Sequence, residues 1–147
     1  MSDTPIDPDA LKNRLGDPAA GACCVFEGWV RNMNEGQPVQ SLAYEAYGPL
    51  AEKEGNRILE EARERWPLLQ VEAVHRTGHL QLGDLAVWVG VASGHRDAAF
   101  AACRFLIDTI KARVPIWKKE YYVSGASQWI NCTDPGDIAP EPPGCNH

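Results

Sequence analysis

The order of apolar and polar residues along the chain predicts pairs of strands separated by single helices. Residues 41–47 and 69–76 alternate between two sets of side chains, which is the two-residue period of a half-buried strand. Residues 22–31 are rich in Val, Phe and Trp and also predict a strand. Residues 85–92 (LAVWVGVA) form an unbroken apolar run of strand length. We expect that strand to be buried on both faces.

Two helices are predicted between these strands. The first runs from Pro49, a favoured residue in a first helical turn, to Trp66 and stops before Pro67. The second follows Ser93, a plausible cap, and continues to about residue 113, since Pro115 prevents its extension. Residues 116–123 and 127–131 then predict two short strands. The order β-β-α-β-β-α-β-β favours an α+β fold with antiparallel pairing.

The two ends of the chain differ from this pattern. Residues 1–20 are rich in Pro, Asp and Gly and predict an N-terminal arm or a short leading helix. Residues 133–147 contain four prolines and predict a flexible tail. We therefore expect one α+β domain over residues 21–132.

Composition excludes several classes of protein. The formal net charge of −6 argues against nonspecific nucleic-acid binding. No apolar run approaches the roughly 18 residues of a membrane span, and the polar N-terminus does not resemble a secretory signal. The five cysteines are odd in number and contain no CxxC pair, which disfavours a disulfide framework or a zinc site. We expect a cytoplasmic protein.

Basic residues gather in one part of this acidic chain. Between residues 95 and 119 there are six Lys and Arg residues against two Asp residues. His95 and Arg96 lie where the second helix begins, a place that favours anions. Lys111 precedes the bend at Pro115, after which a strand returns with Lys118 and Lys119. The pattern predicts an anion-binding cleft with lysines, although a solvated helix face with its own ion pairs would have the same composition.

These residues lie within a longer resemblance to the large, catalytic subunits of molybdopterin synthase, the MoaE family. The resemblance runs from about Phe26 to Ile130. Its pieces are FEGWVRNMN at 26–34, YEAY at 44–47, EEARERWP at 60–67, HRTGHL at 75–80, GDLAVWVGVASGHR at 83–96, KARVPIWKKE at 111–120 and WI at 129–130. Each piece is weak alone, but together, in order and with compatible spacing, they are specific.

The resemblance implies an alpha/beta hammerhead fold with a smaller α+β subdomain. It also implies a homodimer that binds one small ubiquitin-like subunit at each end, giving a heterotetramer. The small subunit's Gly-Gly C-terminus would be a thiocarboxylate, and the substrate would be cyclic pyranopterin monophosphate. Sulfur transfer would then build the dithiolene of molybdopterin for molybdenum cofactor biosynthesis. Because the partner supplies the sulfur, the resemblance implies no bound cofactor and no metal.

The resemblance also suggests roles for individual residues. Lys111 would meet the partner's C-terminus and stabilise the developing oxyanion, and Lys118 would act as an acid or base on the pterin. The implied substrate-binding residues are Arg31, His95, Arg96, Lys119, Glu120 and Phe26. Part of the pocket would be donated across the dimer, with Arg31 serving the neighbouring site. Core packing is an equal alternative for Phe26.

Three positions depart from the family pattern: Trp29 stands where a lysine is common, Met33 where a histidine is frequent, and Cys132 near an expected arginine. Two other functions are compatible with the residues. One is a non-catalytic homologue that binds the small subunit or an anion, and the other is a thiol enzyme that uses Cys103. The second is disfavoured, because Cys103 lies on the inner stripe of its helix.

Overall fold

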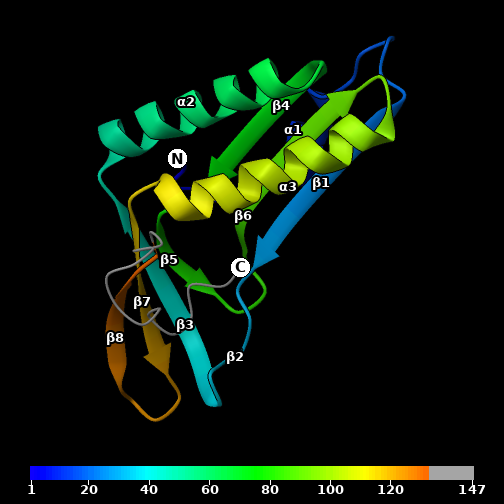
Figure 1. The fold of residues 1–147 in the computed structure, drawn as a ribbon. Helices are drawn as coiled ribbons and strands as arrows, with labels where there is room; N and C mark the ends of the chain where they lie inside the picture. Colours follow the sequence, from blue (N-terminus) through cyan, green and yellow to red (C-terminus); the bar gives the residue numbers. More distant parts are fainter. Residues whose placement is uncertain (133–147) are drawn as a thin grey trace.

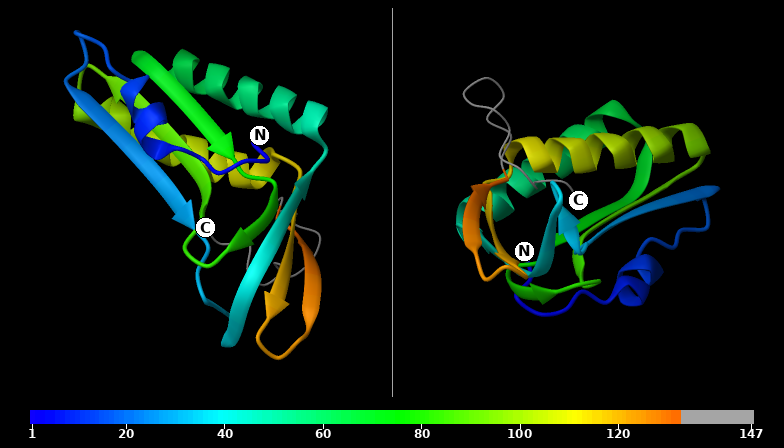
Figure 2. Two further views of the ribbon diagram at one scale, coloured as in Figure 1. Left: turned by 180° about the vertical axis from the view of Figure 1, so that it is seen from behind. Right: turned by 90° about the horizontal axis from the view of Figure 1, so that it is seen from below.

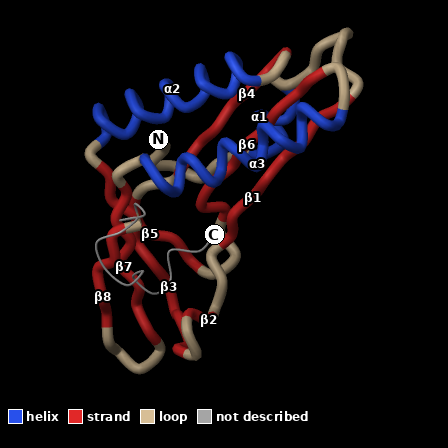
Figure 3. Tube along the Cα trace, in the orientation of Figure 1, coloured by secondary structure: helices blue, strands red, loops and turns tan. Residues whose placement is uncertain are grey.

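A computed structural model describes residues 1–132 of the chain. Within these residues the strands form two antiparallel sheets, one of three strands and one of five (Figure 1). Helices α2 (Gly48–Arg65) and α3 (Arg96–Arg113) lie side by side over one face of the three-stranded sheet. The five-stranded sheet extends from one end of this layered body (Figure 3).

The three-stranded sheet has the order β1-β6-β4. β1 (Ala22–Trp29) and β4 (Leu68–His75) both pair antiparallel with the central β6 (Leu85–Ser93). β6 is buried along almost its whole length. Helix α3 covers one of its faces and α1 (Pro8–Asn13) lies on the other (Figure 2). This two-sided cover explains why the sequence of β6 is continuously apolar rather than alternating.

Helix α1 joins the body through a small apolar cluster. Leu11 and Leu15 pack on the fully buried Trp88 of β6. Gly90 makes room for this contact, because an added Cβ would lie 2.3 Å from the Trp88 ring and 2.7 Å from Leu15. The N-terminal arm is therefore a short packed helix rather than a loose segment.

The five-stranded sheet centres on β3 (Gln37–Ala46). It pairs with β2 (Met33–Asn34), with β5 (Gly78–Gln81) and with β7 (Ile116–Tyr122), and β7 pairs in turn with β8 (Ser127–Asn131). The side chains of Val39, Leu42 and Tyr44 on β3 are buried. β7 begins three residues after α3 ends, so the bend at Pro115 joins the two layers.

The α+β class with antiparallel pairing is confirmed, and both predicted helices are present. Two details differ from expectation. Ser93 is not the cap of α3, because His95 is the N-cap residue and the Ser93 Oγ donates instead to the His95 carbonyl at 2.6 Å. β5 is a short additional strand in a segment for which no strand was predicted. The predicted tail at 133–147 lies outside the described residues. Within residues 1–132, no helix is long and apolar enough to cross a membrane.

Candidate functional site

The inner face of β7 presents Lys118 to a hollow beside the end of β1. Strand alternation places Lys118, Glu120 and Tyr122 on the inner face and Trp117, Lys119 and Tyr121 on the outer face. The walls of this hollow, called the Lys118 hollow below, are formed by Trp29, Val30, Arg31, Met33, Asn34, Val39, Leu42, Tyr44, Lys118 and Glu120.

Two cationic side chains border the Lys118 hollow in different ways. Lys118 is only 3% exposed, and its Nζ lies 3.0 Å from Oε1 of the buried Glu120. Arg31 is exposed at the rim, just beyond the end of β1. A hollow with a held ammonium inside and a guanidinium at its mouth suits an anion. Arg31 therefore lines the same hollow as Lys118 within one chain.

Lys111 lines a second hollow, together with His75, Ile107, Ile110, Val114, Ile116 and Cys132 among others. The two hollows are neighbours. Tyr44 lines the Lys118 hollow and His75 lines the Lys111 hollow, and their rings meet edge to face with centroids 4.8 Å apart. The bend at Pro115 thus brings both lysines to one region. The pair of rings from Tyr44 and His75, called the Tyr44–His75 wall below, lies between their two hollows.

His75 is the buried titratable group between these hollows. Burial lowers the pKa of its imidazole to about 4, so the ring is neutral at pH 7. Its Nδ1 lies 2.8 Å from the Arg76 carbonyl oxygen, which makes the Nδ1–H the donor. A neutral ring adds no positive charge of its own to this region.

His95 and Arg96 lie far from both lysines in one chain. They stand exposed at the N-terminal end of α3, whereas Lys111 lies in its last turn. At a rise of 1.5 Å per residue, the helix separates the Arg96 and Lys111 backbones by roughly 22 Å. A single copy of the described chain therefore does not bring these two groups together.

Two other predicted residues face away from the hollows. Lys119 lies on the outer face of β7, with its Nζ 5.2 Å from the Tyr121 ring centroid and 5.6 Å from that of Trp129. Phe26 is half-buried and packs against the main core cluster under α3. The position of Phe26 in the chain therefore corresponds to the core-packing alternative. Lys119 and Lys118 are neighbours in sequence but point to opposite faces of β7.

The cysteines do not form a reactive site in the described chain. Cys103 is buried, and burial together with the neighbouring Cys24 raises the pKa of its thiol to about 12. Almost no thiolate is present at neutral pH, which agrees with the expectation that Cys103 is unreactive.

The histidines His75 and His79 contact different rings, those of Tyr44 and Tyr121. Residues 1–132 contain no cluster of His, Cys, Asp and Glu suited to a metal ion.

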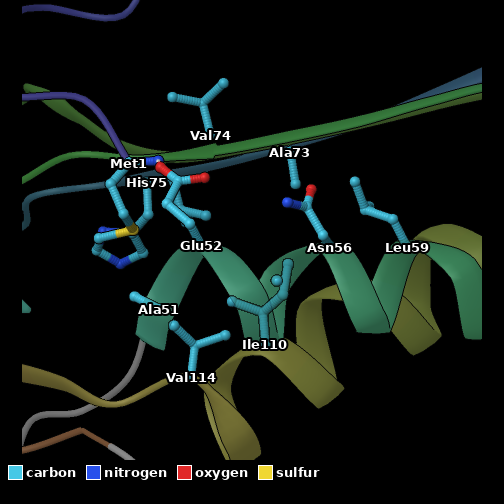
Figure 4. Close-up of a pocket in the computed structure, with 12 residues that line it drawn as sticks. Met1, Ala51, Glu52, Asn56, Leu59, Ala73, Val74, His75, Ile110 and Val114 are labelled. Carbon is cyan, nitrogen blue, oxygen red and sulfur yellow. The ribbon is translucent and has the colours of Figure 1, made fainter. Parts of the chain in front are cut away.

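A cleft between α2 and β4 is a poorer candidate for an anion site (Figure 4). The Met1 side chain closes one end, and its ammonium group forms an ion pair with Glu52. The walls are mostly apolar, and among the described residues that line it there is no Lys or Arg. The cationic hollows, rather than this cleft, therefore form the candidate site.

Sequence reasoning missed two polar residues of the site. Tyr122 shares the inner face of β7 with both Lys118 and Glu120, so strand alternation could have indicated it. Asn34 lies 86 residues before Glu120 and donates to its carboxylate at 2.9 Å. No local pattern connects positions so far apart, because β3 brings them together only after folding.

Known proteins resemble this chain in sequence and in fold. The family model described as MoaE protein matches residues 1–113. The molybdopterin synthase catalytic subunit of Vibrio cholerae is 49% identical over 115 residues, which are 78% of this chain and 76% of that protein. The crystal structure of molybdopterin synthase from Staphylococcus aureus matches with a TM-score of 0.80 and 41% identity, covering 85% of this chain and 90% of that one.

A more distant likeness concerns the fold alone. A protein–protein complex of subunits 1 and 2 of molybdopterin-converting factor from Helicobacter pylori contains a chain with a TM-score of 0.67 and 20% identity. The match covers 90% of this chain and 84% of that one. The family model spans residues 1–113, which include Arg31 and Lys111 and end before β7. The chain therefore belongs to the MoaE protein family.

Proposed function

We propose that this chain is the catalytic subunit of a molybdopterin synthase. It would transfer sulfur from the C-terminal thiocarboxylate of a small ubiquitin-like subunit to cyclic pyranopterin monophosphate. The names of its relatives support this activity. The structural observation on which the proposal depends is the buried Lys118–Glu120 pair, which faces a hollow with Arg31 at its rim.

The Lys118 hollow is the proposed substrate site. A cyclic phosphate is an anion, and Arg31 offers a planar guanidinium that can donate two hydrogen bonds to it. Trp29 and Met33 add exposed apolar surface to the same walls, which suits a flat heteroaromatic ring. Lys118 then lies inside the hollow, where its ammonium group can deliver a proton to the bound pterin and the resulting neutral amine can receive one back.

The Lys111 hollow is the proposed site for the partner's C-terminus. A thiocarboxylate is also an anion, and a Gly-Gly tail is thin enough to enter a narrow space. Lys111 would stabilise the negative charge that develops on the carbonyl oxygen as sulfur leaves the acyl group. The Tyr44–His75 wall between the hollows would keep the tail and the pterin in adjacent places. The assembly of the Helicobacter pylori protein with a second subunit supports a partner of this kind.

A second copy of the chain would complete the site. His95 and Arg96 lie at the opposite end of α3 from Lys111, so they can reach a lysine hollow only if another protomer presents them. We therefore propose a homodimer in which His95 and Arg96, rather than Arg31, act across the interface. With one small subunit on each protomer the assembly would be a heterotetramer. It would work in the cytoplasm, without nucleic acid or membrane.

Reconstitution tests the proposal directly. The purified chain would be mixed with a thiocarboxylated small subunit and cyclic pyranopterin monophosphate, and the pterin product analysed by mass spectrometry. We expect a product that has gained two sulfur atoms, while a carboxylate form of the small subunit gives none. Binding of the small subunit without any product would contradict the proposal and favour the non-catalytic homologue.

A further inference from the structure

The carboxylate of Glu120 is the centre of a buried polar cluster. Its Oε1 lies 3.0 Å from the Lys118 Nζ. Its Oε2 accepts two hydrogen bonds, from the Asn34 Nδ2 at 2.9 Å and from the Tyr122 hydroxyl at 2.7 Å. All four side chains are buried, with exposed fractions of 8% or less. Both oxygens of Glu120 are thus engaged by groups of the protein itself.

The two oxygens of Glu120 have different partners, and this determines which oxygen pairs with Lys118. Two neutral donors hold Oε2, and this leaves Oε1 as the atom that faces Lys118. Hydrogen bonds to an ionised carboxylate favour its charged form, which a buried ion pair requires. Burial and the hydrogen bond to Glu120 raise the pKa of Tyr122 to about 12, so its hydroxyl stays protonated and donates. The cluster therefore fixes the position of the Glu120 carboxylate and, through it, that of the Lys118 side chain.

The cluster also connects two separate parts of the site. Asn34 belongs to β2, in the loop that follows Arg31, whereas Lys118 and Glu120 belong to β7. The buried Oδ1 of Asn34 has no hydrogen-bond partner among the described residues. A buried acceptor without a partner is unfavourable. The hydrogen bond from the Asn34 Nδ2 to Glu120 ties the Arg31 loop to the lysine strand.

We propose that Asn34 and Tyr122 are positioning residues that act through Glu120. They hold the Lys118 side chain in the wall of its hollow, and they keep the Arg31 loop in a fixed position relative to Lys118. This inference rests on the proposed function for the role of Lys118. It gives Glu120 a task different from the substrate contact that the sequence suggested. Glu120 would anchor the lysine rather than touch the pterin.

Tyr122→Phe tests the proposal because it removes one hydroxyl and keeps the ring. We expect kcat to fall about tenfold, as for loss of a hydrogen bond to a charged group, while KM changes by less than about twofold. Tyr121→Phe is the matched control. It removes the same atom from the neighbouring residue, which lies on the outer face of β7, and should leave kcat unchanged.

A double-mutant cycle distinguishes positioning from a general structural effect. Glu120→Gln removes the charged centre through which Tyr122 is proposed to act. In that background Tyr122→Phe should cost little further activity, since coupled residues are not additive. An equal loss in both backgrounds, or full activity of Tyr122→Phe alone, would overturn the proposal.

A readout without catalysis completes the test. The ammonium protons of Lys118, observed by nuclear magnetic resonance of the 15N-labelled side chain, should exchange slowly with water in the wild type. They should exchange faster in Tyr122→Phe and in Asn34→Ala, and at the wild-type rate in Tyr121→Phe. Unchanged exchange in the first two variants would refute the positioning role even if the wild type converts the precursor. Failure of the wild type to convert the precursor would instead contradict the proposed function alone.

Discussion

The rings of Tyr44 and His75 meet edge to face, with centroids 4.8 Å apart and planes at 84°. Tyr44 comes from β3 and His75 from the last position of β4, so this contact joins the five-stranded sheet to the three-stranded one. It also forms the wall between the hollow of Lys118 and that of Lys111. The stability of this wall depends on His75 remaining neutral in the interior.

The neutral state of His75 predicts a loss of stability in acid. Its pKa is about 4 in the folded protein and about 6.5 in the unfolded chain. Between these values the unfolded chain binds a proton that the folded protein does not. The contribution is therefore complete above pH 6.5 and is lost as the pH falls towards 4. The lost free energy of unfolding should be about 3 kcal/mol.

His75→Asn tests this, because the amide can replace the Nδ1–H donor but does not titrate. Urea unfolding of both proteins from pH 7.5 to pH 4 gives the free energy of unfolding at each pH. Other groups contribute equally to both curves, so the difference between them isolates His75. We expect the wild type to lose more stability than the variant between pH 6.5 and 4. Parallel curves would contradict a neutral buried imidazole.

Lys118 should be important for stability as well as for turnover. Lys118→Met removes the cation and leaves Glu120 buried without its counter-charge, which should lower the free energy of unfolding by about 3 kcal/mol at neutral pH. Glu120→Gln in the same chain should restore much of that stability but no activity. Thermal unfolding and product analysis of both variants check the prediction. A Lys118→Met variant as stable as the wild type would show that the Lys118–Glu120 pair is not held in the protein interior.

Lys111→Ala should abolish conversion of the precursor with little effect on the fold. Lys111 is partly exposed in the last turn of α3, and the main core is formed by other residues of that helix. The salt bridges from Arg113 to Glu54 and Glu61 still join α3 to α2 in this variant. Single-turnover sulfur transfer from a thiocarboxylated partner measures the effect. Normal transfer would remove Lys111 from the catalytic machinery.

The strands and helices of the layered body could be predicted because local patterns determine them. The run from Leu85 to Ala92 indicated a strand buried on both faces, and Pro67 and Pro115 indicated where the helices end. β5 was missed because it has only four residues and begins at Gly78, whose φ of +92° is typical of a turn. Its strand conformation depends on pairing with β3, which is a tertiary contact.

The site could be predicted only in part. The lysines could be placed near a bend because Pro115 lies between them in the sequence. The alternation of β7 separates Lys118 from Lys119, and the length of α3 separates Arg96 from Lys111. Both facts follow from the geometry of regular elements. The bond between Asn34 and Glu120 could not be predicted, since it depends on the register of β2 with β3 and of β3 with β7.

Cys103→Ser should retain activity if the protein folds. Cys103 is 4% exposed, belongs to the buried face of α3 in the main core, and does not line either lysine hollow. Its raised pKa keeps the thiol protonated and poorly nucleophilic. Steady-state turnover of the variant, with circular dichroism as the control for folding, checks this. A folded variant without activity would support the thiol enzyme that the structure disfavours.

Donation of Arg96 across a dimer predicts complementation between two inactive proteins. Lys111→Ala lacks one half of the site and Arg96→Ala lacks the other. A mixed dimer has one site with both defects and one with neither, provided that Arg96 acts on the neighbouring protomer. Random exchange gives half mixed dimers, so about one quarter of the wild-type activity should return at low substrate concentration. Two affinity tags purify the mixed dimer, and native mass spectrometry confirms its composition. A purified mixed dimer with no more activity than its parents would place Arg96 in the site of its own chain, because every site would then contain a defect.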